Sequence, residues 1–175
     1  MSSTLRLEIV TPVATVFSED VEMVTLPGVE GEIGILPQHV PLMTQMVPGE
    51  MVVRKNGQDR FLAVGEGAVW VLNQGNGSVS RIDPKTNKVV ATIEAGVPGT
   101  GGDIAAGEGS VWVTSFDFPL SRIDPATNRV VQQFVGEGGD AVRVGLGSVW
   151  LSNGRAQNAW RIDPKRVEAT VAEFH

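Results

Sequence analysis

The chain has 175 residues and a formal net charge of −6 at pH 7. An acidic chain is repelled on average by the phosphate backbone of nucleic acid and by anionic lipid, so neither is an expected partner. It contains no cysteine, which excludes disulfides, thiolate metal sites and cysteine nucleophiles. With 42% hydrophobic residues, 21 glycines and short runs rich in Val and Thr, the composition favours an all-β fold with tight turns.

The N-terminal sequence lacks the pattern of a targeting signal. No charged segment followed by a long apolar core occurs there, and no apolar run in the chain has the length that a membrane span needs. We therefore expect no membrane insertion and a cytoplasmic location.

The first sixty residues are non-repetitive and contain short β runs. The expected strands lie at residues 5–10, 13–17, 21–26, 31–36, 51–55 and 60–64. Pro-Gly and Asn-Gly pairs at 27–28, 48–49 and 56–57 supply turns between them. Short, closely spaced strands without helical periodicity predict a sandwich or barrel.

After residue 60 one pattern recurs three times. A Gly-x-Gly-x-Val-Trp motif stands at residues 65–70, 107–112 and 145–150, and each copy is followed by Arg-Ile-Asp-Pro, at 81–84, 122–125 and 161–164. The motif tryptophans are 42 and 38 residues apart. A period near forty with strand-like content is typical of a four-stranded propeller blade.

The pattern within one repeat predicts four strands, at residues 104–106, 110–115, 120–123 and 129–134. Asp-Pro followed by Thr-Asn predicts the turn before the last strand, since Asp accepts a backbone N–H and Asn tolerates left-handed geometry. The predicted fold is thus all-β, with an incomplete β-sandwich followed by three four-stranded propeller-type blades. The expected domains are 1–60 and 61–175, with repeats at about 61–103, 104–141 and 142–175.

Residues 5–12, 21–44 and 48–67 carry a resemblance to a known family. Their sequences, LRLEIVTP, VEMVTLPGVEGEIGILPQHVPLMT and PGEMVVRKNGQDRFLAVGEG, resemble the N-terminal β-sandwich of the epsilon subunit of bacterial F-type ATP synthase. In that family the sandwich packs on the central rotor stalk and against the membrane ring, and a C-terminal helical hairpin regulates ATP hydrolysis. The resemblance does not include the hairpin, so we expect no regulation through it.

This resemblance implies a partner-binding surface in or near the part that contacts the rotor. The residues carried over are Glu30, Gly31, Leu36, Pro37 and His39. Gln38 and Val40 stand where the family would have small residues, Gly and Ala, beside the His. The alternative is that residues 30–39 are only a hairpin and a loop of the sandwich.

Residues 61 to 175 are similar to the propeller repeats of the streptogramin lyases and the YVTN-type repeat proteins. The two resemblances overlap at FLAVGEG, residues 61–67, a strand and turn that suit both. This overlap predicts an engineered or recombinant chimera without catalytic activity of its own. The alternatives are an epsilon-type rotor-binding fragment and a propeller ligand-binding module or lyase.

The lyases of that family use a His as general acid or base, together with a metal. Only His39 and His175 occur here, and neither falls at a propeller position. We therefore expect no enzyme activity and no cofactor. Asp103 and Asp140 recur after paired glycines and suit either a metal at the mouth of a channel or capped turns, of which capping is favoured, so no metal site is predicted.

The motif tryptophans suit packing between blades better than ligand stacking. Trp160 replaces the serines of the other copies and is assigned to a partner contact. The motif arginines Arg81, Arg122 and Arg161 are predicted to form surface ion pairs with the adjacent Asp.

Three blades would leave two open faces, because closed propellers usually have more blades. We therefore expect a homo-oligomer through these faces, with ATP synthase rotor subunits as the other possible partners. In the competing hypothesis, residues 68–72 and 78–82 instead supply the missing final strands of the sandwich.

Overall fold

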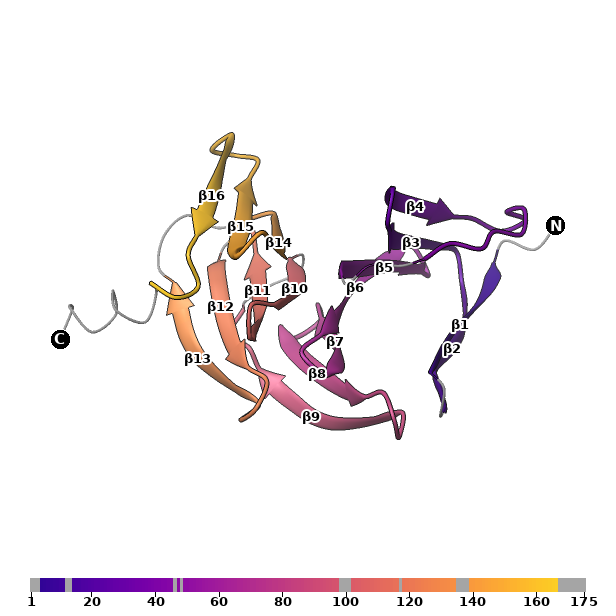
Figure 1. Cartoon of the computed structure of the whole chain (residues 1–175), viewed down its shortest axis with the longest axis horizontal. Coiled ribbons are helices and arrows are strands. Elements are labelled where there is room, and N and C mark those ends of the chain that lie inside the picture. The colour runs from indigo at the N-terminus through magenta and orange to yellow at the C-terminus, as the bar shows by residue number, and fades with distance from the viewer. Residues whose placement is uncertain are drawn as a thin grey trace.

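The computed structural model describes residues 4–11, 14–45, 47, 49–97, 102–116, 118–134 and 139–166. Within these ranges it has sixteen strands and no helix, which confirms the all-β class. Accordingly, the described part of the chain offers no helix long and apolar enough to cross a membrane. The sheets follow one another around an open arc, with β14–β16 near one end and β1–β4 near the other (Figure 1).

The first part of the chain forms a two-stranded sheet and most of a seven-stranded sheet. The small sheet pairs β1 (Leu5–Thr11) with β2 (Ala14–Val21). The large sheet has the order β4-β3-β5-β6-β7-β8-β9. Its strands are β3 (Met23–Gly28), β4 (Gly31–Ile35), β5 (Gly49–Lys55), β6 (Gln58–Gly65), β7 (Ala68–Asn73), β8 (Ser78–Asp83) and β9 (Lys88–Glu94).

The later repeats form two separate antiparallel sheets. The second repeat is the four-stranded meander β10 (Asp103–Gly107), β11 (Ser110–Ser115), β12 (Phe118–Asp124) and β13 (Arg129–Phe134). The third repeat contributes β14 (Ala141–Gly145), β15 (Ser148–Asn153) and β16 (Asn158–Ile162). A fourth strand of this repeat would fall outside the described residues.

The strands on either side of residue 60 share one sheet, and β7 is buried on both faces. Val69 and Val71 pack with Val21 and Val24 in the core between the large sheet and β1–β2, and Ile82 of β8 joins them. This agrees with the hypothesis that residues 68–72 and 78–82 complete the sandwich. The expected division at 60/61 lies inside β6, and the domain scheme stays a prediction.

The motif aspartates are turn residues, as predicted. Asp83, Asp124 and Asp163 each accept a hydrogen bond from the backbone N–H two residues ahead, at 2.8, 2.9 and 2.9 Å. Asn87 and Asn128 end the first two turns with φ of 58° and 56°, the left-handed conformation that Asn tolerates. The repeated turn chemistry therefore sets where the third strand ends and the fourth begins.

The motif tryptophans were all predicted to pack between repeats, and those of the first two repeats do so. Trp70 lies in one core with Ile104 and Val111 of the second repeat, and Trp112 lies in another with Val142 of the third. Both side chains are 0% exposed, whereas Trp150 of the third repeat is 38% exposed. Trp160 of β16 is also 38% exposed, and its assignment to a partner contact stays a prediction.

The motif arginines have a different role from the one that the sequence predicted. Each is the cross-strand partner of the motif Trp, and its guanidinium lies over the indole ring, at 5.1, 5.2 and 5.7 Å from the ring centroid in the three repeats. Arg81 also donates through Nη1 to the carbonyl of Pro125 and to Asn128 Oδ1 in the next repeat, both at 2.7 Å. These contacts tie repeats together, which the adjacency of Arg and Asp in the sequence does not reveal.

Candidate interaction surface

The predicted partner-binding residues lie along β4 and the loop after it. Glu30 and Gly31 form the tip of the β3–β4 hairpin, where Gly28 and Gly31 are cross-strand partners. Leu36 and His39 follow the other end of β4, so the length of that strand, about 17 Å at the usual rise per residue, separates them from the tip. The structure therefore gathers these residues along one edge and not at one point.

The segment after β4 runs back toward the hairpin tip. The backbone N–H of Val29 donates to the Gln45 carbonyl at 3.3 Å, and that of Val47 donates to the Pro27 carbonyl at 3.1 Å. Residues 36–45, called here the apolar loop, thus lie between the end of β4 and the tip of the hairpin. β4 is the edge strand of the large sheet, so among the described residues the loop borders an edge with no further strand.

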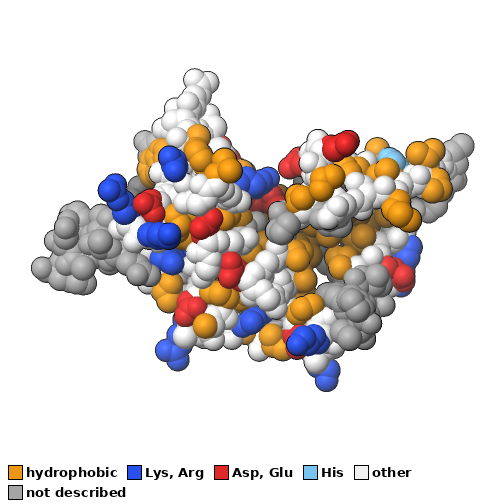
Figure 2. Space-filling model, in the orientation of Figure 1, with side chains coloured by type: hydrophobic (Ala, Val, Ile, Leu, Met, Phe, Trp, Pro, Cys, Tyr) orange, Lys and Arg blue, Asp and Glu red, His pale blue; other side chains and the backbone are white. Residues whose placement is uncertain are grey.

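The apolar loop exposes large hydrophobic side chains. Leu36, Val40, Leu42 and Met43 are 52% to 98% exposed, Met43 most of all. Hydrophobic side chains gather at this end of the molecule in Figure 2. Neighbouring exposed apolar side chains are typical of a surface that contacts another molecule, since single exposed hydrophobics are common but groups of them are not.

His39 is exposed within the loop, and its contacts are local. Its backbone N–H donates to the Leu36 carbonyl at 3.1 Å, and Nδ1 lies 2.7 Å from the Val40 carbonyl. Gln38 before it has φ of 68°, a conformation that favours glycine. This is the physical reason for a small residue at that position, and the turn forms here although Gln occupies it. His175 lies outside the described residues.

An apolar groove adjoins the apolar loop, and the sequence analysis missed it. It has a volume of about 620 Å³ and runs between β1 and the large sheet. Its apolar lining is Leu7, Ile9, Leu26, Pro27, Val47, Met51 and Val64. The signal in the sequence is the alternation of Leu5, Leu7 and Ile9 in β1. A groove of this size and lining suits the apolar side chains of a partner.

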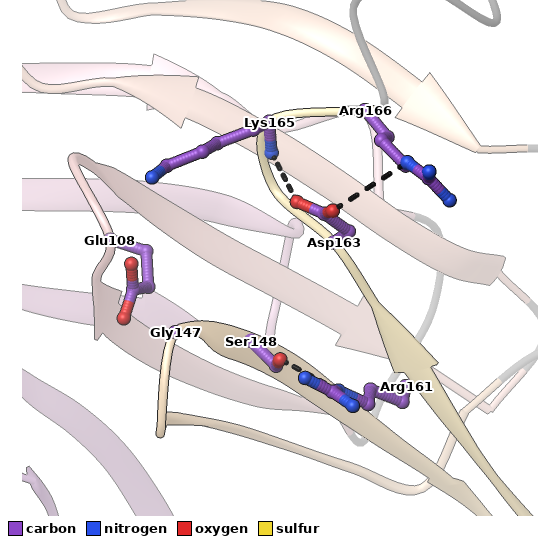
Figure 3. A pocket seen from close by; sticks show the side chains of 7 residues that line it. All are labelled: Glu108, Gly147, Ser148, Arg161, Asp163, Lys165 and Arg166. Atoms are coloured by element: carbon purple, nitrogen blue, oxygen red, sulfur yellow. Dashed lines mark hydrogen bonds and ion pairs between the residues drawn. The ribbon is translucent and has the colours of Figure 1, made fainter.

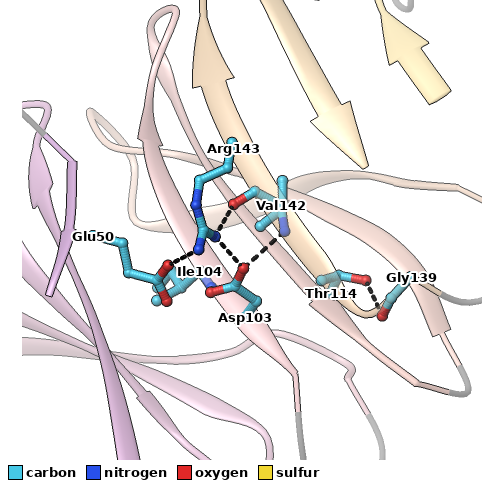
Figure 4. Close-up of polar contacts among 7 residues, drawn as sticks. All are labelled: Glu50, Asp103, Ile104, Thr114, Gly139, Val142 and Arg143. Carbon is cyan, nitrogen blue, oxygen red and sulfur yellow. Dashed lines mark hydrogen bonds and ion pairs between the residues drawn. The ribbon is translucent and has the colours of Figure 1, made fainter. Parts of the chain in front are cut away.

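Three strands of different sheets meet at a charged cluster in which the two carboxyl groups are buried and the Arg143 side chain is 48% exposed (Figure 4). The Arg143 guanidinium of β14 lies 2.7 Å from the Glu50 carboxyl group of β5 and forms an ion pair with Asp103 of β10. Asp103 also accepts hydrogen bonds from the backbone N–H groups of Ile104 and Val142, at 2.9 and 2.8 Å. The cluster therefore links the sandwich strand β5 to the second and third repeats.

The cluster holds two carboxyl groups but one guanidinium, so a proton is favoured on one carboxyl. Asp103 accepts hydrogen bonds from three N–H donors, those of Ile104, Val142 and Arg143. Glu50 has a side chain only 5% exposed, and its Oε1 has no hydrogen-bond partner among the described residues. Burial, followed by the neighbouring Asp103, raises the pKa of Glu50 to about 9.

This protonation makes stability depend on pH. Above the ordinary Glu pKa of 4.5 the unfolded chain ionises Glu50 while the folded chain keeps its proton, so stability falls as pH rises toward about 9. Glu50→Gln cannot ionise, and we expect the variant to match the parent at pH 5 and to exceed it by about 1–3 kcal/mol at pH 8. Urea unfolding across this range measures the difference.

Glu94→Gln, at an exposed position in β9, is the matched control. It should leave the pH dependence of the parent unchanged. Equal pH profiles for Glu50→Gln and the parent would contradict a protonated Glu50.

The two aspartates considered for a metal both accept backbone hydrogen bonds instead. Asp103 has the contacts given above, and Asp140 accepts from the backbone N–H of Gly154. Among the described residues, no group of three or more His, Cys, Asp or Glu side chains is placed to hold a metal ion. Asp140 thus caps a backbone N–H group, whereas Asp103 links the second repeat to β14, and the absence of a metal site stays a prediction.

The first part of the chain is thus a β-sandwich that presents an apolar edge. Residues 4–75 match the family model described as ATP synthase, Delta/Epsilon chain, beta-sandwich domain. The ATP synthase epsilon chain of Desulforamulus reducens is 45% identical over 73 residues, covering 42% of this chain and 55% of the relative. That of Herpetosiphon aurantiacus is 48% identical over 68 residues, covering 39% and 50%. The chain spans about half the length of these relatives.

Solved structures resemble the fold less closely. Hydrazine synthase of Kuenenia stuttgartiensis gives a TM-score of 0.49 at 14% identity, covering 74% of this chain and 49% of that one. The computationally designed Ika4 protein gives 0.48 at 15% identity, covering 68% and 83%.

These findings correct the interpretation of the chain as an engineered or recombinant chimera without activity. Relatives at 45% and 48% identity are named ATP synthase epsilon chain, and the family match points to an epsilon-type β-sandwich at residues 4–75. The match also runs to residue 75, past the supposed splice at 61–67, because β7 belongs to the same sheet as β3 and β5.

Proposed function

We propose that this protein is an epsilon-type subunit of an F-type ATP synthase, which binds the rotor stalk through the apolar loop. The observation that carries the proposal is the match of residues 4–75 to the epsilon-type sandwich, a range that includes the whole loop. The exposed Leu42 and Met43 support it, since a subunit that works in an assembly needs an apolar contact surface.

A pull-down with the rotor stalk subunit tests this proposal. The purified chain should retain the stalk subunit, and Met43→Asp should weaken retention at least tenfold, because a buried, unpaired charge costs more than about 1.4 kcal/mol at an interface. The matched control is Val90→Asp in β9, which is 53% exposed and far from the loop in the sequence. Equal binding by the two variants, or none by the parent chain, would contradict the proposal.

We propose further that the three repeats are propeller-type blades. Their support is the period near forty residues, the four-stranded meander β10–β13 and the tryptophans packed between repeats. The absence of enzyme activity, the cytoplasmic location and the homo-oligomer stay predictions. Light scattering at micromolar concentrations tests the last of these.

A further inference from the structure

Successive repeats meet in one orientation. In each repeat the Trp and Arg of the motif are cross-strand partners, so they share one face of the sheet. In the first two repeats that face packs on the following repeat, as the cores around Trp70 and Trp112 show. The same face of the third repeat, carrying Trp150 and Arg161, is called here the terminal face.

The tryptophan of the terminal face is arranged as its buried counterparts are. Its Nε1–H donates to the Gly145 carbonyl at 3.1 Å, as Trp112 donates to Gly107 at 3.1 Å. Yet Trp150 is 38% exposed and Trp112 is fully buried. The local conformation is therefore the same, and the difference is that the described residues leave Trp150 partly uncovered.

The arginine of the terminal face is also held as its counterpart is. Arg161 donates through Nε to Ser148 Oγ at 2.9 Å (Figure 3). Arg122 donates in the same way to Ser110 Oγ at 2.8 Å. Arg122 extends Nη1 to the Pro164 carbonyl in the turn of the next repeat, at 3.4 Å. Arg161 instead lines an open pocket of about 440 Å³.

The first glycine of each motif gives a third comparison. A Cβ at Gly65 would lie 3.1 Å from Ala106 of the next repeat, and one at Gly107 would lie 2.8 Å from Val144 Cγ1. A Cβ at Gly145 would meet nothing within 4 Å. The first two glycines make room for the following strand, and the third leaves the same room with no strand described there.

We propose that the terminal face docks a further four-stranded repeat of the same type. The Asp-Pro-x-Thr-Asn turn of that repeat offers Arg161 the Pro carbonyl and Asn amide that Arg81 finds at Pro125 and Asn128. Its first strand passes over Gly145, and its aliphatic side chains cover Trp150. The contact is confined to the outer part of the face, because Arg143 stands where the second repeat has Ala105 and is engaged with Glu50.

A second copy of the chain fits this face less well. The face that a repeat offers to its predecessor is, in the first repeat, already used within the chain, where Val69, Val71 and Ile82 pack into the sandwich core. The self-association predicted from the sequence would use the same terminal face. The test must therefore distinguish a further repeat from a second copy of the chain.

The first experiment extends the full chain with a copy of residues 95–134 after His175. The background variant is Trp160→Phe, and the copied Trp112 is also changed to Phe, so that Trp150 is the tryptophan whose exposure is followed. Acrylamide quenching should fall several-fold on extension. A second extension, with Gly-Ser residues in the copied Asp-Pro turn, should protect Trp150 less.

Unchanged quenching in the extended chain would overturn the proposal, whether the added segment folds elsewhere or not at all. The second experiment measures the mass of the unextended chain by light scattering. A monomer is the result that docking of a further repeat predicts, in place of the homo-oligomer that is expected from the sequence. A concentration-dependent dimer that Trp150→Ser abolishes would show that a second copy covers the face, and would also overturn the proposal.

Discussion

Gly77→Ala is expected to abolish most of the stability of the fold. Gly77 closes the turn between β7 and β8 with φ of 70°, and a Cβ there would lie 1.8 Å from the Val97 carbonyl oxygen. The Val97 carbonyl is backbone and the position of a Cβ is fixed by the backbone of residue 77, so no side-chain rotation can relieve the clash. We expect a loss above about 4 kcal/mol, out of the roughly 5–15 kcal/mol that stabilises a typical domain.

Urea unfolding followed by tryptophan fluorescence measures this loss. Gly75→Ala is the matched control in the same turn, since a Cβ there would meet nothing within 4 Å. It should change stability by less than about 1 kcal/mol. Similar urea midpoints for both variants would contradict the prediction, because the segment around Val97 would then move aside with little loss of stability.

Trp112→Ala is expected to have the second large effect, a loss of about 3–5 kcal/mol. The ring is fully buried among side chains of the second and third repeats, with the Phe134 ring centroid at 6.5 Å and Arg122 over its face. Removing the ring leaves a cavity between the sheet β10–β13 and the sheet β14–β16.

Trp150→Ala is the internal comparison for this prediction. The same residue stands there at the same place in the motif, but it is partly exposed, so about 1 kcal/mol is expected. Thermal unfolding of the two variants gives the contrast. Equal losses would indicate that the stacking of Arg on Trp within a repeat, and not the contact between repeats, stabilises the protein.

The repeat allowed the strands to be predicted closely. Residues 110–115 and 129–134 were expected as strands and are β11 and β13 with the same bounds. The expected strand 104–106 is β10, which is one residue longer at each end. Repetition helps because turns with the same Asp, Asn and Gly positions recur, and these residues set φ locally.

Which sheet each strand joins was harder to predict from the sequence. The pattern after residue 60 suits a blade, and nothing in it indicates that β6–β9 continue the sheet of β3–β5. Local alternation fixes which side chains share a face, but not which sheet a strand joins. The hypothesis of added sandwich strands was available only because the family resemblance stopped short of a complete sandwich.

The candidate site was predicted in part. Residues 30–39, most of which are exposed, came from the resemblance, and the apolar character of Leu42 and Met43 is visible in the sequence. The cluster of Glu50, Asp103 and Arg143 was not foreseen, because its members lie about 40 to 50 residues apart in the sequence, on strands of three sheets. The repeat also conceals it, since Ala105 occupies the position of Arg143.

The place of β7 between two cores limits which segments of the chain can be removed. Strand β7 lies between two hydrophobic cores, with Val69 and Val71 in one and Trp70 and Leu72 in the other. Deleting β1–β2 or the second repeat would expose one face of β7, with its bulky apolar side chains, to water and to other chains. Such exposure favours aggregation. Deletion or exchange of the strands on either side of β7 is therefore expected to destabilise the protein.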